Sequence, residues 1–87
     1  MSTPTVIVYV SRWCGYCSAA KRLLSSKGVS YEVVSLDEHP ELRREVVERS
    51  GRMTVPQVFI DGVPYGGYDE LVALDREGRL DVALGLI

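Results

Sequence analysis

The chain has 87 residues, of which 46% are hydrophobic, and a formal net charge of −2 at pH 7. This length predicts one domain over residues 1–87 with a single modest core. The charge balance and the lack of a basic run interleaved with aromatics argue against a nucleic-acid partner. The longest early apolar run, Val6–Val10, is too short for a membrane span or a signal-peptide core. We therefore expect a monomer in the reducing cytoplasm, with no membrane partner.

The first half of the chain reads as a strand–helix–strand unit. After a loose terminus at Met1–Pro4, the β-branched and aromatic run Thr5–Val10 predicts a strand buried on both faces. A helix is expected from about Gly15 to Ser26, with Gly28 just beyond its end. Tyr31–Leu36 alternates loosely and predicts a second strand. A crossover of this length makes the two strands parallel.

The middle of the chain predicts a helix followed by a β-hairpin. Pro40 suits a helix start and Gly51 a helix end, and the charged residues between them indicate a solvated face. Gln57–Ile60 has the composition of a strand. Asp61-Gly62 is a strong two-residue hairpin signal, so the chain should return along Val63–Tyr65. The proline within that returning strand predicts a sheet edge.

The last segment predicts two short helices, and with them the fold class. One helix should begin near Tyr68 and break at Gly78, and a second should cover Arg79–Leu84. The whole pattern describes an α/β protein with a four-stranded mixed sheet and helices on both faces. Cys14 then lies at the carboxyl end of the first strand, where open α/β sheets usually hold their ligands.

The chain's two cysteines, Cys14 and Cys17, follow that first strand with two residues between them. At the N-terminus of a helix, backbone N–H groups and the positive end of the dipole favour the thiolate form of Cys14. Arg12 and Lys21 add positive potential nearby. Cys17 is close enough to resolve a mixed disulfide formed at Cys14. A single Cys-x-x-Cys inside a strand–helix–strand unit favours redox catalysis.

Other interpretations of the cysteine pair remain open. A structural disulfide would close so short a loop that it removes only about 2 kcal/mol of unfolded-state entropy. Structural zinc usually takes four ligands, commonly Cys and His, and His39 is the chain's one histidine. We interpret His39 as a surface turn residue. Two buried, inert thiols would not require the exposed turn that Gly15 and Tyr16 indicate.

Three motifs in order resemble the glutaredoxin family over nearly the whole chain. They are Cys14-Gly15-Tyr16-Cys17, Thr54-Val55-Pro56-Gln57-Val58-Phe59-Ile60 and Gly66-Gly67-Tyr68-Asp69-Glu70-Leu71. The resemblance implies a thioredoxin fold, a cis bond before Pro56 and glutathione as the reductant. It also implies that Asp69 and the Tyr68 N–H hold the γ-glutamyl end of glutathione. The glutathione-binding residues it implies are Arg12, Tyr16, Arg52, Thr54, Val55, Pro56, Gly67, Tyr68 and Asp69.

Several positions depart from the pattern that the family usually shows. Gly15 stands where proline is common, and Ser11 stands where lysine is common. Arg52 replaces a glutamine that often contacts the glycine carboxylate of glutathione, a contact that arginine can make bidentately. Tyr68 replaces a small residue. Trp13 is either a partly exposed platform beside Cys14 or a core tryptophan.

The sequence thus predicts a glutathione-dependent thiol–disulfide oxidoreductase acting on protein disulfides and protein–glutathione mixed disulfides. Cys14 and Cys17 are its predicted catalytic residues. One alternative is a redoxin that thioredoxin reductase reduces. Another is a [2Fe–2S] carrier or sensor, in which two chains each supply Cys14 and two glutathiones complete the four thiolates.

Overall fold

A computed structural model of the protein describes residues 4–87. The predicted loose terminus at Met1–Pro4 therefore lies, apart from Pro4, outside the described residues. The described elements are β1 (Val6–Val10), α1 (Gly15–Ser26), β2 (Glu32–Ser35), the 3₁₀ helix η1 (Pro40–Leu42), α2 (Arg43–Ser50), β3 (Gln57–Ile60), β4 (Val63–Gly66), α3 (Tyr68–Arg76) and α4 (Arg79–Ala83).

The four strands form one mixed sheet in the order β2-β1-β3-β4. β1 pairs parallel with β2, and β3 pairs antiparallel with both β1 and β4. As predicted, the turn between β3 and β4 consists of Asp61 and Gly62, which have φ values of 51° and 80°. Both values are positive, as the tight turn of a twisted hairpin requires. Pro64 lies on the edge strand β4, where no further strand needs its missing N–H.

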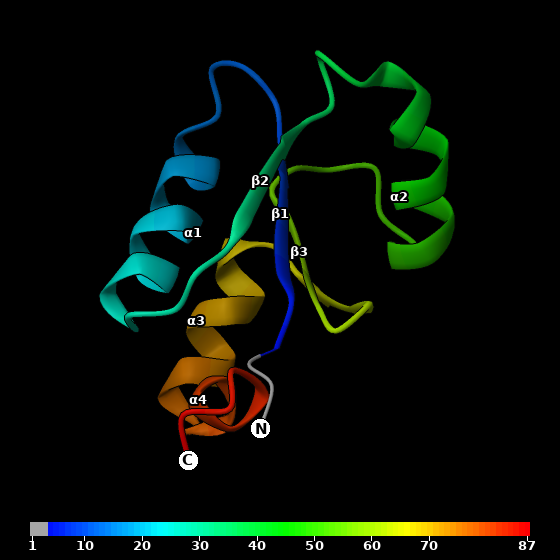
Figure 1. Cartoon of the computed structure of the whole chain (residues 1–87). Helices are drawn as coiled ribbons and strands as arrows, with labels where there is room; N and C mark the ends of the chain where they lie inside the picture. Colours follow the sequence, from blue (N-terminus) through cyan, green and yellow to red (C-terminus); the bar gives the residue numbers. More distant parts are fainter. Residues whose placement is uncertain (1–3) are drawn as a thin grey trace.

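Helices cover both faces of the sheet, so the predicted architecture is confirmed (Figure 1). α1, α3 and α4 cover one face and α2 the other. The larger core cluster joins alternate residues of β1 and β3 to apolar residues of α1, α3 and α4. Its buried members are Val6, Val8, Val10, Cys17, Ala20, Leu24, Val58, Ile60, Leu71, Leu80 and Leu84.

The α2 face of the sheet has a smaller core, centred on Leu36, Val46 and Phe59. The prediction that the first strand is buried on both faces is therefore wrong for this face, where Ile7 and Tyr9 are only half-buried. α2 has eight residues and packs toward the β3–β4 side of the sheet, so it does not extend over the whole sheet. Because α2 is short and lies away from β1, part of this face of β1 remains in contact with water.

Arg49 connects α2 to the β3–β4 hairpin. Its guanidinium lies 4.9 Å from the centroid of the Phe59 ring, a cation–π distance. The same group donates a hydrogen bond of 2.8 Å to the carbonyl oxygen of Gly62 in the hairpin turn. Tyr9 also packs against Phe59, edge-to-face at 5.3 Å between ring centroids. α2 and the hairpin are thus joined by packing and by a polar contact.

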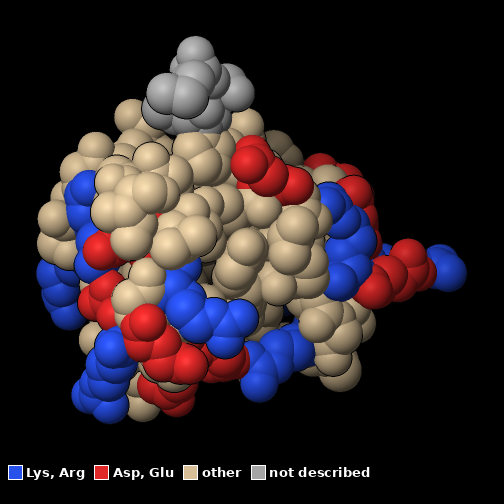
Figure 2. All heavy atoms as spheres, turned by 90° about the horizontal axis from the view of Figure 1, so that it is seen from below, with Lys and Arg blue, Asp and Glu red and all other residues tan. Residues whose placement is uncertain are grey.

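Lys27, at the end of α1, connects that helix to α3 and α4. Its ammonium forms ion pairs with Asp75 and with Asp81, the second at 2.9 Å. These two hydrogen-bonded carboxylates raise the pKa of Lys27 above its ordinary value. Figure 2 views this end of the molecule, opposite the Cys14 turn, and shows basic and acidic side chains intermixed over it. This face therefore has no large area of a single charge.

Candidate active site

Cys14 is the N-cap residue of α1, as the sequence predicts. The turn at Arg12 and Trp13 ends β1, and Cys14 then has the extended backbone of an N-cap, with φ −110° and ψ 102°. Its Sγ accepts a hydrogen bond of 3.1 Å from the backbone N–H of Cys17. The positive end of the helix dipole also faces this sulfur. Because Cys14 is half-exposed, its sulfur combines an anion-stabilising position with access from solvent.

Cys17 lies in a different environment one turn further along α1. Its side chain is 3% exposed and packs in the larger core cluster. Burial, together with its hydrogen bond to Cys14, raises the pKa of Cys17 to about 12 from an ordinary 9.0, although Lys21 acts in the opposite direction. Cys17 therefore keeps its proton at neutral pH. Because the folded chain holds this proton more tightly, the resulting stabilisation is present below pH 9 and is lost as pH rises toward about 12.

These two environments predict selective alkylation. In a short pulse of iodoacetamide at pH 7, we expect modification of Cys14 and none of Cys17, because the thiolate is the nucleophile and Cys17 is both protonated and buried. Peptide mapping by mass spectrometry measures the two yields. Protein unfolded in urea is the control, in which both cysteines should be modified. Faster labelling of Cys17 in the folded protein would contradict the assignment.

The segment before β3 lies beside Cys14. The sulfur of Cys14 is 3.7 Å from the carbonyl oxygen of Val55, which accepts the weak hydrogen bond of the thiol. The bond between Val55 and Pro56 is cis, as the resemblance implies. The buried Gln57 then donates through Nε2 to the carbonyl oxygen of Thr54 at 3.0 Å, which fixes the loop to the start of the strand. The backbone next to the sulfur is thus held by contacts within its own segment.

An open groove of about 470 Å³ begins at this segment. One wall comes from the α2–β3 loop, the other from the start of α3, and Tyr16 contributes from α1. The lining residues are Tyr16, Arg52, Met53, Thr54, Val55, Pro56, Gly67, Tyr68, Asp69 and Glu70. The groove therefore brings together eight of the nine glutathione-binding residues that the resemblance implies. Met53 and Glu70 complete it and were not foreseen from the sequence.

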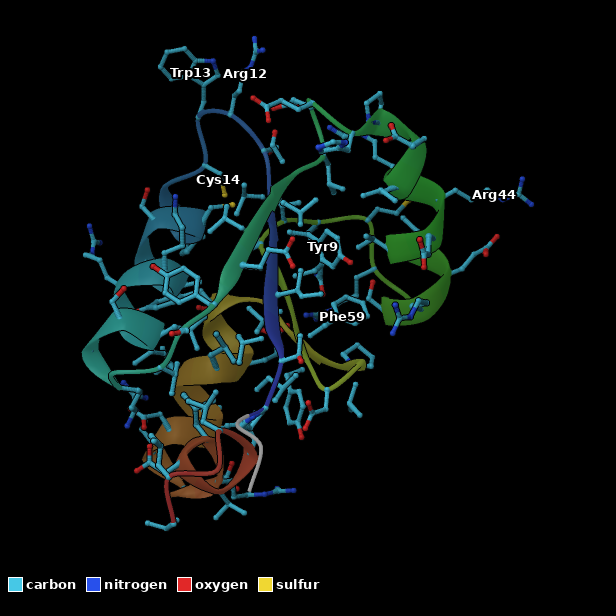
Figure 3. All side chains as sticks on the ribbon, viewed as in Figure 1. Tyr9, Arg12, Trp13, Cys14, Arg44 and Phe59 are labelled. Carbon is cyan, nitrogen blue, oxygen red and sulfur yellow. The ribbon has the colours of Figure 1, made fainter. Side chains whose placement is uncertain are left out.

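Arg12 is the predicted binding residue that the groove does not include. Its backbone N–H donates to a carboxylate oxygen of Asp37 at 2.7 Å, which holds the turn against the loop that follows β2. Its side chain points away from the fold beside Trp13, and both are at the tip of the turn (Figure 3). The structure therefore places the charge of Arg12 at the tip of the turn and not in the lining of the groove.

The two glycines before α3 allow its wall to approach the loop. A Cβ atom at Gly67 would lie 3.1 Å from the carbonyl oxygen of Pro56, so a side chain there would separate the two walls. Gly66 has φ +96°, which L-residues rarely adopt, and a Cβ atom there would lie 2.9 Å from Glu70. The backbone of Gly66 and the close approach at Gly67 therefore both favour glycine where α3 meets the loop.

The charges of the groove differ from the sequence-based expectation. Arg52 forms an ion pair with Glu70, eighteen residues further along the chain. The resemblance implies that Arg52 contacts the glycine carboxylate of glutathione, and the fold also places an internal carboxylate beside it. Glu70 belongs to the third motif of the resemblance, but nothing in the sequence predicts Arg52 as its partner. Asp69 is exposed, and within residues 4–87 it forms no ion pair.

Aromatic side chains flank the reactive sulfur. Tyr16 and Tyr68 lie 6.2 Å apart between ring centroids at an interplanar angle of 35°, both on the groove. Trp13 is 99% exposed, so the interpretation of Trp13 as a core residue is wrong. It has a left-handed backbone with φ 57°, which costs a bulky residue about 1 kcal/mol or more. A second hollow, of about 330 Å³, lies beside it and is lined by Val10, Ser11, Trp13, Cys14, Gly15, Cys17, Ser18 and Lys21.

Within residues 4–87, no three or more His, Cys, Asp or Glu residues are grouped so that they could hold a metal ion. In the same part of the chain, no helix is both long and apolar enough to cross a membrane. Cys14 and Cys17 are both free thiols. A half-exposed N-cap thiol with a buried partner thiol, on a mixed sheet of this order, defines a redox-active dithiol protein.

Comparison with known proteins identifies the family. The Glutaredoxin family profile matches residues 6–64. A glutaredoxin of Pseudomonas aeruginosa is 46% identical over 81 residues, covering 93% of this chain and 96% of the relative. Glutaredoxin 3 of Escherichia coli K12 is 51% identical over 79 residues, covering 91% and 95%. The chain belongs to the glutaredoxin family and is a thiol–disulfide oxidoreductase.

Solved structures with the same architecture are also glutaredoxins. The solution structure of a glutaredoxin from Brucella melitensis has a TM-score of 0.84 and 48% identity, covering 97% of this chain and 91% of that one. The crystal structure of a buckwheat glutaredoxin–glutathione complex has a TM-score of 0.86 and 32% identity, covering 94% and 77%. The sheet order and helix placement described above are thus those of the thioredoxin fold.

Proposed function

We propose that the protein is a glutathione-dependent reductase of protein–glutathione mixed disulfides and of protein disulfides, acting in the cytoplasm. One observation carries the proposal: the groove extends from the backbone beside the Cys14 sulfur to the N-terminus of α3. Glutathione is a short peptide with a thiol, two carboxylates and an ammonium group. A backbone edge, an arginine, a helix N-terminus and an exposed carboxylate match those groups in kind. The buckwheat relative forms a complex with glutathione.

In the first half-reaction, the Cys14 thiolate attacks the glutathione sulfur of a mixed disulfide. A new Cys14–glutathione disulfide forms as the old bond breaks, and the protein substrate leaves as a thiolate that takes a proton from water. The N–H of Cys17 and the start of α1 stabilise the negative charge on Cys14 before attack. The groove holds the glutathionyl group while the substrate protein departs.

In the second half-reaction, a free glutathione thiolate attacks the glutathione sulfur of that adduct. Glutathione disulfide leaves, and Cys14 returns as a thiolate. With a protein disulfide as substrate, Cys17 instead attacks the mixed disulfide at Cys14 and closes the Cys14–Cys17 bond, which two glutathiones then reduce. Cys17 must lose its proton for this step, and its burial opposes that loss.

A coupled assay tests the proposal and separates it from its first alternative. Reduction of a small glutathione mixed disulfide is followed by NADPH consumption with either glutathione plus glutathione reductase or thioredoxin reductase as electron source. We expect turnover with the glutathione system and only background with thioredoxin reductase. The opposite result would identify a redoxin reduced by thioredoxin reductase.

The charges along the groove predict modest effects on glutathione recognition. Exposed ion pairs contribute about 0–1 kcal/mol, so no single charge should control binding. We expect Asp69→Ala to raise the KM for glutathione about three- to fivefold, and Arg52→Ala to raise it less, because Glu70 already occupies the guanidinium. Steady-state kinetics with varied glutathione measure both values. Unchanged kinetics in the double variant would place the glutathione site elsewhere.

A substitution at Glu70 should have the opposite effect on the KM for glutathione. Glu70→Gln removes the internal carboxylate from Arg52 and leaves its guanidinium free for a ligand carboxylate. We expect the KM for glutathione to fall about twofold, with kcat unchanged. Glu48→Gln is the matched control, since Glu48 pairs with Arg44 on the outer face of α2 at 2.9 Å and lines no part of the groove. A rise in KM would mean instead that Glu70 holds Arg52 in its binding position.

A cluster-bridged dimer is the second candidate function. A [2Fe–2S] cluster takes four thiolates, and one chain supplies two cysteines, so the residues of a single chain do not fit the group. The observation in its favour is Gly15, where a Cβ atom would meet nothing within 4 Å, so the fold itself does not require a glycine. Anaerobic reconstitution with iron, sulfide and glutathione tests the idea. Visible absorbance and a dimer on gel filtration would support it, and a colourless, active monomer would exclude it.

A further inference from the structure

Trp13 is the most exposed large apolar side chain of the described residues. It is the chain's single tryptophan, it directly precedes Cys14, and it has a strained left-handed backbone. At 99% exposure, burial among residues 4–87 does not compensate for placing an indole in water. A large apolar residue kept in solvent on strained backbone, beside a nucleophile, indicates contact with something outside the chain.

The hollow beside Trp13 has a charge preference. Among the described residues that line it, Lys21 is the charged one. Arg12 adds a second positive charge at the tip of the same turn (Figure 3). Asp37 contacts the turn, but its carboxylate already accepts hydrogen bonds from the Arg12 N–H and from Arg43 at 3.0 Å. The free charge on this side of Cys14 is therefore positive.

This hollow and the glutathione groove are separate. They share no lining residue, and Cys14 lies between them, facing the hollow directly and the groove through its contact with Val55. A ligand can therefore occupy the groove while a second chain contacts Trp13. A mixed disulfide presents both parts at once, a glutathionyl group and the polypeptide segment that bears the modified cysteine.

We propose that Trp13, Lys21 and Arg12 form a subsite for the polypeptide of the substrate, selecting segments with an apolar residue and acidic residues close to the disulfide-bonded cysteine. This inference rests on the proposed function, of which it names the substrate class. Two residues of extended chain reach about 7 Å, and Trp13 directly precedes Cys14, so neighbours of the target cysteine come close to the turn that carries the indole. The apolar residue covers the Trp13 ring, and the acidic residues pair with Lys21 and Arg12.

Two glutathionylated peptides test the proposal by kinetics. They share an apolar residue next to the cysteine and differ in having Glu or Lys at the two flanking positions. At low ionic strength we expect kcat/KM about fivefold higher for the acidic peptide, a preference that disappears in 1 M salt. Lys21→Gln should reduce the ratio of the two values. Because altered thiol reactivity affects both peptides equally, the ratio reports on docking alone.

Removal of the indole gives the second test. Trp13→Ala should lower kcat/KM for the acidic peptide about tenfold relative to kcat/KM for a small mixed disulfide that has no polypeptide. The matched control is Val82→Ala, which shortens another exposed apolar side chain on the remote helix α4 and should change neither value. An equal loss on both substrates would overturn the proposal, since Trp13 would then act only on the geometry of its turn.

The fluorescence of Trp13 gives a readout without catalysis. An unreactive acidic peptide with serine in place of cysteine should shift the emission of the single tryptophan to shorter wavelength and saturate, whereas the basic peptide should not. No shift with either peptide, or equal kinetics for both, would overturn the subsite. Absence of glutathione-coupled turnover on the small mixed disulfide would instead overturn the proposed function, and the fluorescence titration would still test the subsite alone.

Discussion

Cys14→Ser is expected to reduce turnover of every disulfide substrate to the uncatalysed background. The hydroxyl of serine does not ionise at the helix N-terminus as a thiol does, so no mixed disulfide with the enzyme can form. Cys17→Ser, by contrast, should retain the reduction of glutathione mixed disulfides, which needs one cysteine, and lose the route that closes an internal disulfide. The glutathione-coupled assay on both substrate types measures this difference.

A buried serine at position 17 also lowers the stability of the fold, and this effect must be separated from the loss of the thiol. Cys17 is 3% exposed, and an unpartnered hydroxyl there costs about 1–3 kcal/mol of stability. Cys17→Ala avoids that hydroxyl and is the matched variant. In both Cys17 variants the disulfide between Cys14 and glutathione should accumulate, and mass spectrometry should detect it. Full activity of Cys14→Ser on any disulfide would show that Cys17 can act as nucleophile, and the assignment would be wrong.

Leu71→Ala is expected to be the most damaging single change to the groove that touches none of its lining. Leu71 is fully buried in the larger core and follows directly on the residues of α3 that form one wall. Truncating a buried leucine costs about 2–5 kcal/mol, or roughly 10–30 °C in Tm for a domain of this size. We also expect a raised KM for glutathione, because α3 is then held less tightly against the sheet.

Leu80→Ala is the matched control for that prediction. Leu80 is equally buried in the same cluster but belongs to α4, away from the groove. Its loss of Tm should be similar, while the KM for glutathione, measured at a temperature where both variants remain folded, should be unchanged. Equal changes of KM in the two variants would mean that the groove responds to overall stability and not to the anchoring of α3.

The elements that sequence predicted well are those with local signals. The bounds of α1 coincide with the predicted Gly15–Ser26, since a Cys-x-x-Cys after a strand and a glycine after the last turn mark its two ends. The Asp61-Gly62 hairpin was likewise predictable, because few dipeptides tolerate two consecutive positive φ angles. The position of the nucleophile followed from the predicted strand and helix, because Cys14 lies between the end of one and the start of the other.

The features that sequence could not provide depend on residues far apart in the chain. The pairing of Arg52 with Glu70 requires the α2–β3 loop to meet the start of α3, which no local pattern encodes. The exposure of Trp13 depends on the backbone of a two-residue turn. The residue type alone favours a buried position for tryptophan. The half-exposed face of β1 depends on where α2 lies, since an apolar run does not reveal how far its cover extends.

The contact of Arg49 with Phe59 and Gly62 has a consequence for the entropy of binding. The loop that provides Arg52 leaves α2, and the turn that leads to Tyr68 leaves the hairpin, so this one side chain joins the supports of both walls. Walls that are ordered before a ligand arrives lose little conformational freedom when it binds. The weak individual contacts of an open groove can then suffice for the proposed ligand, a small and flexible tripeptide, because most of the ordering was completed when the chain folded.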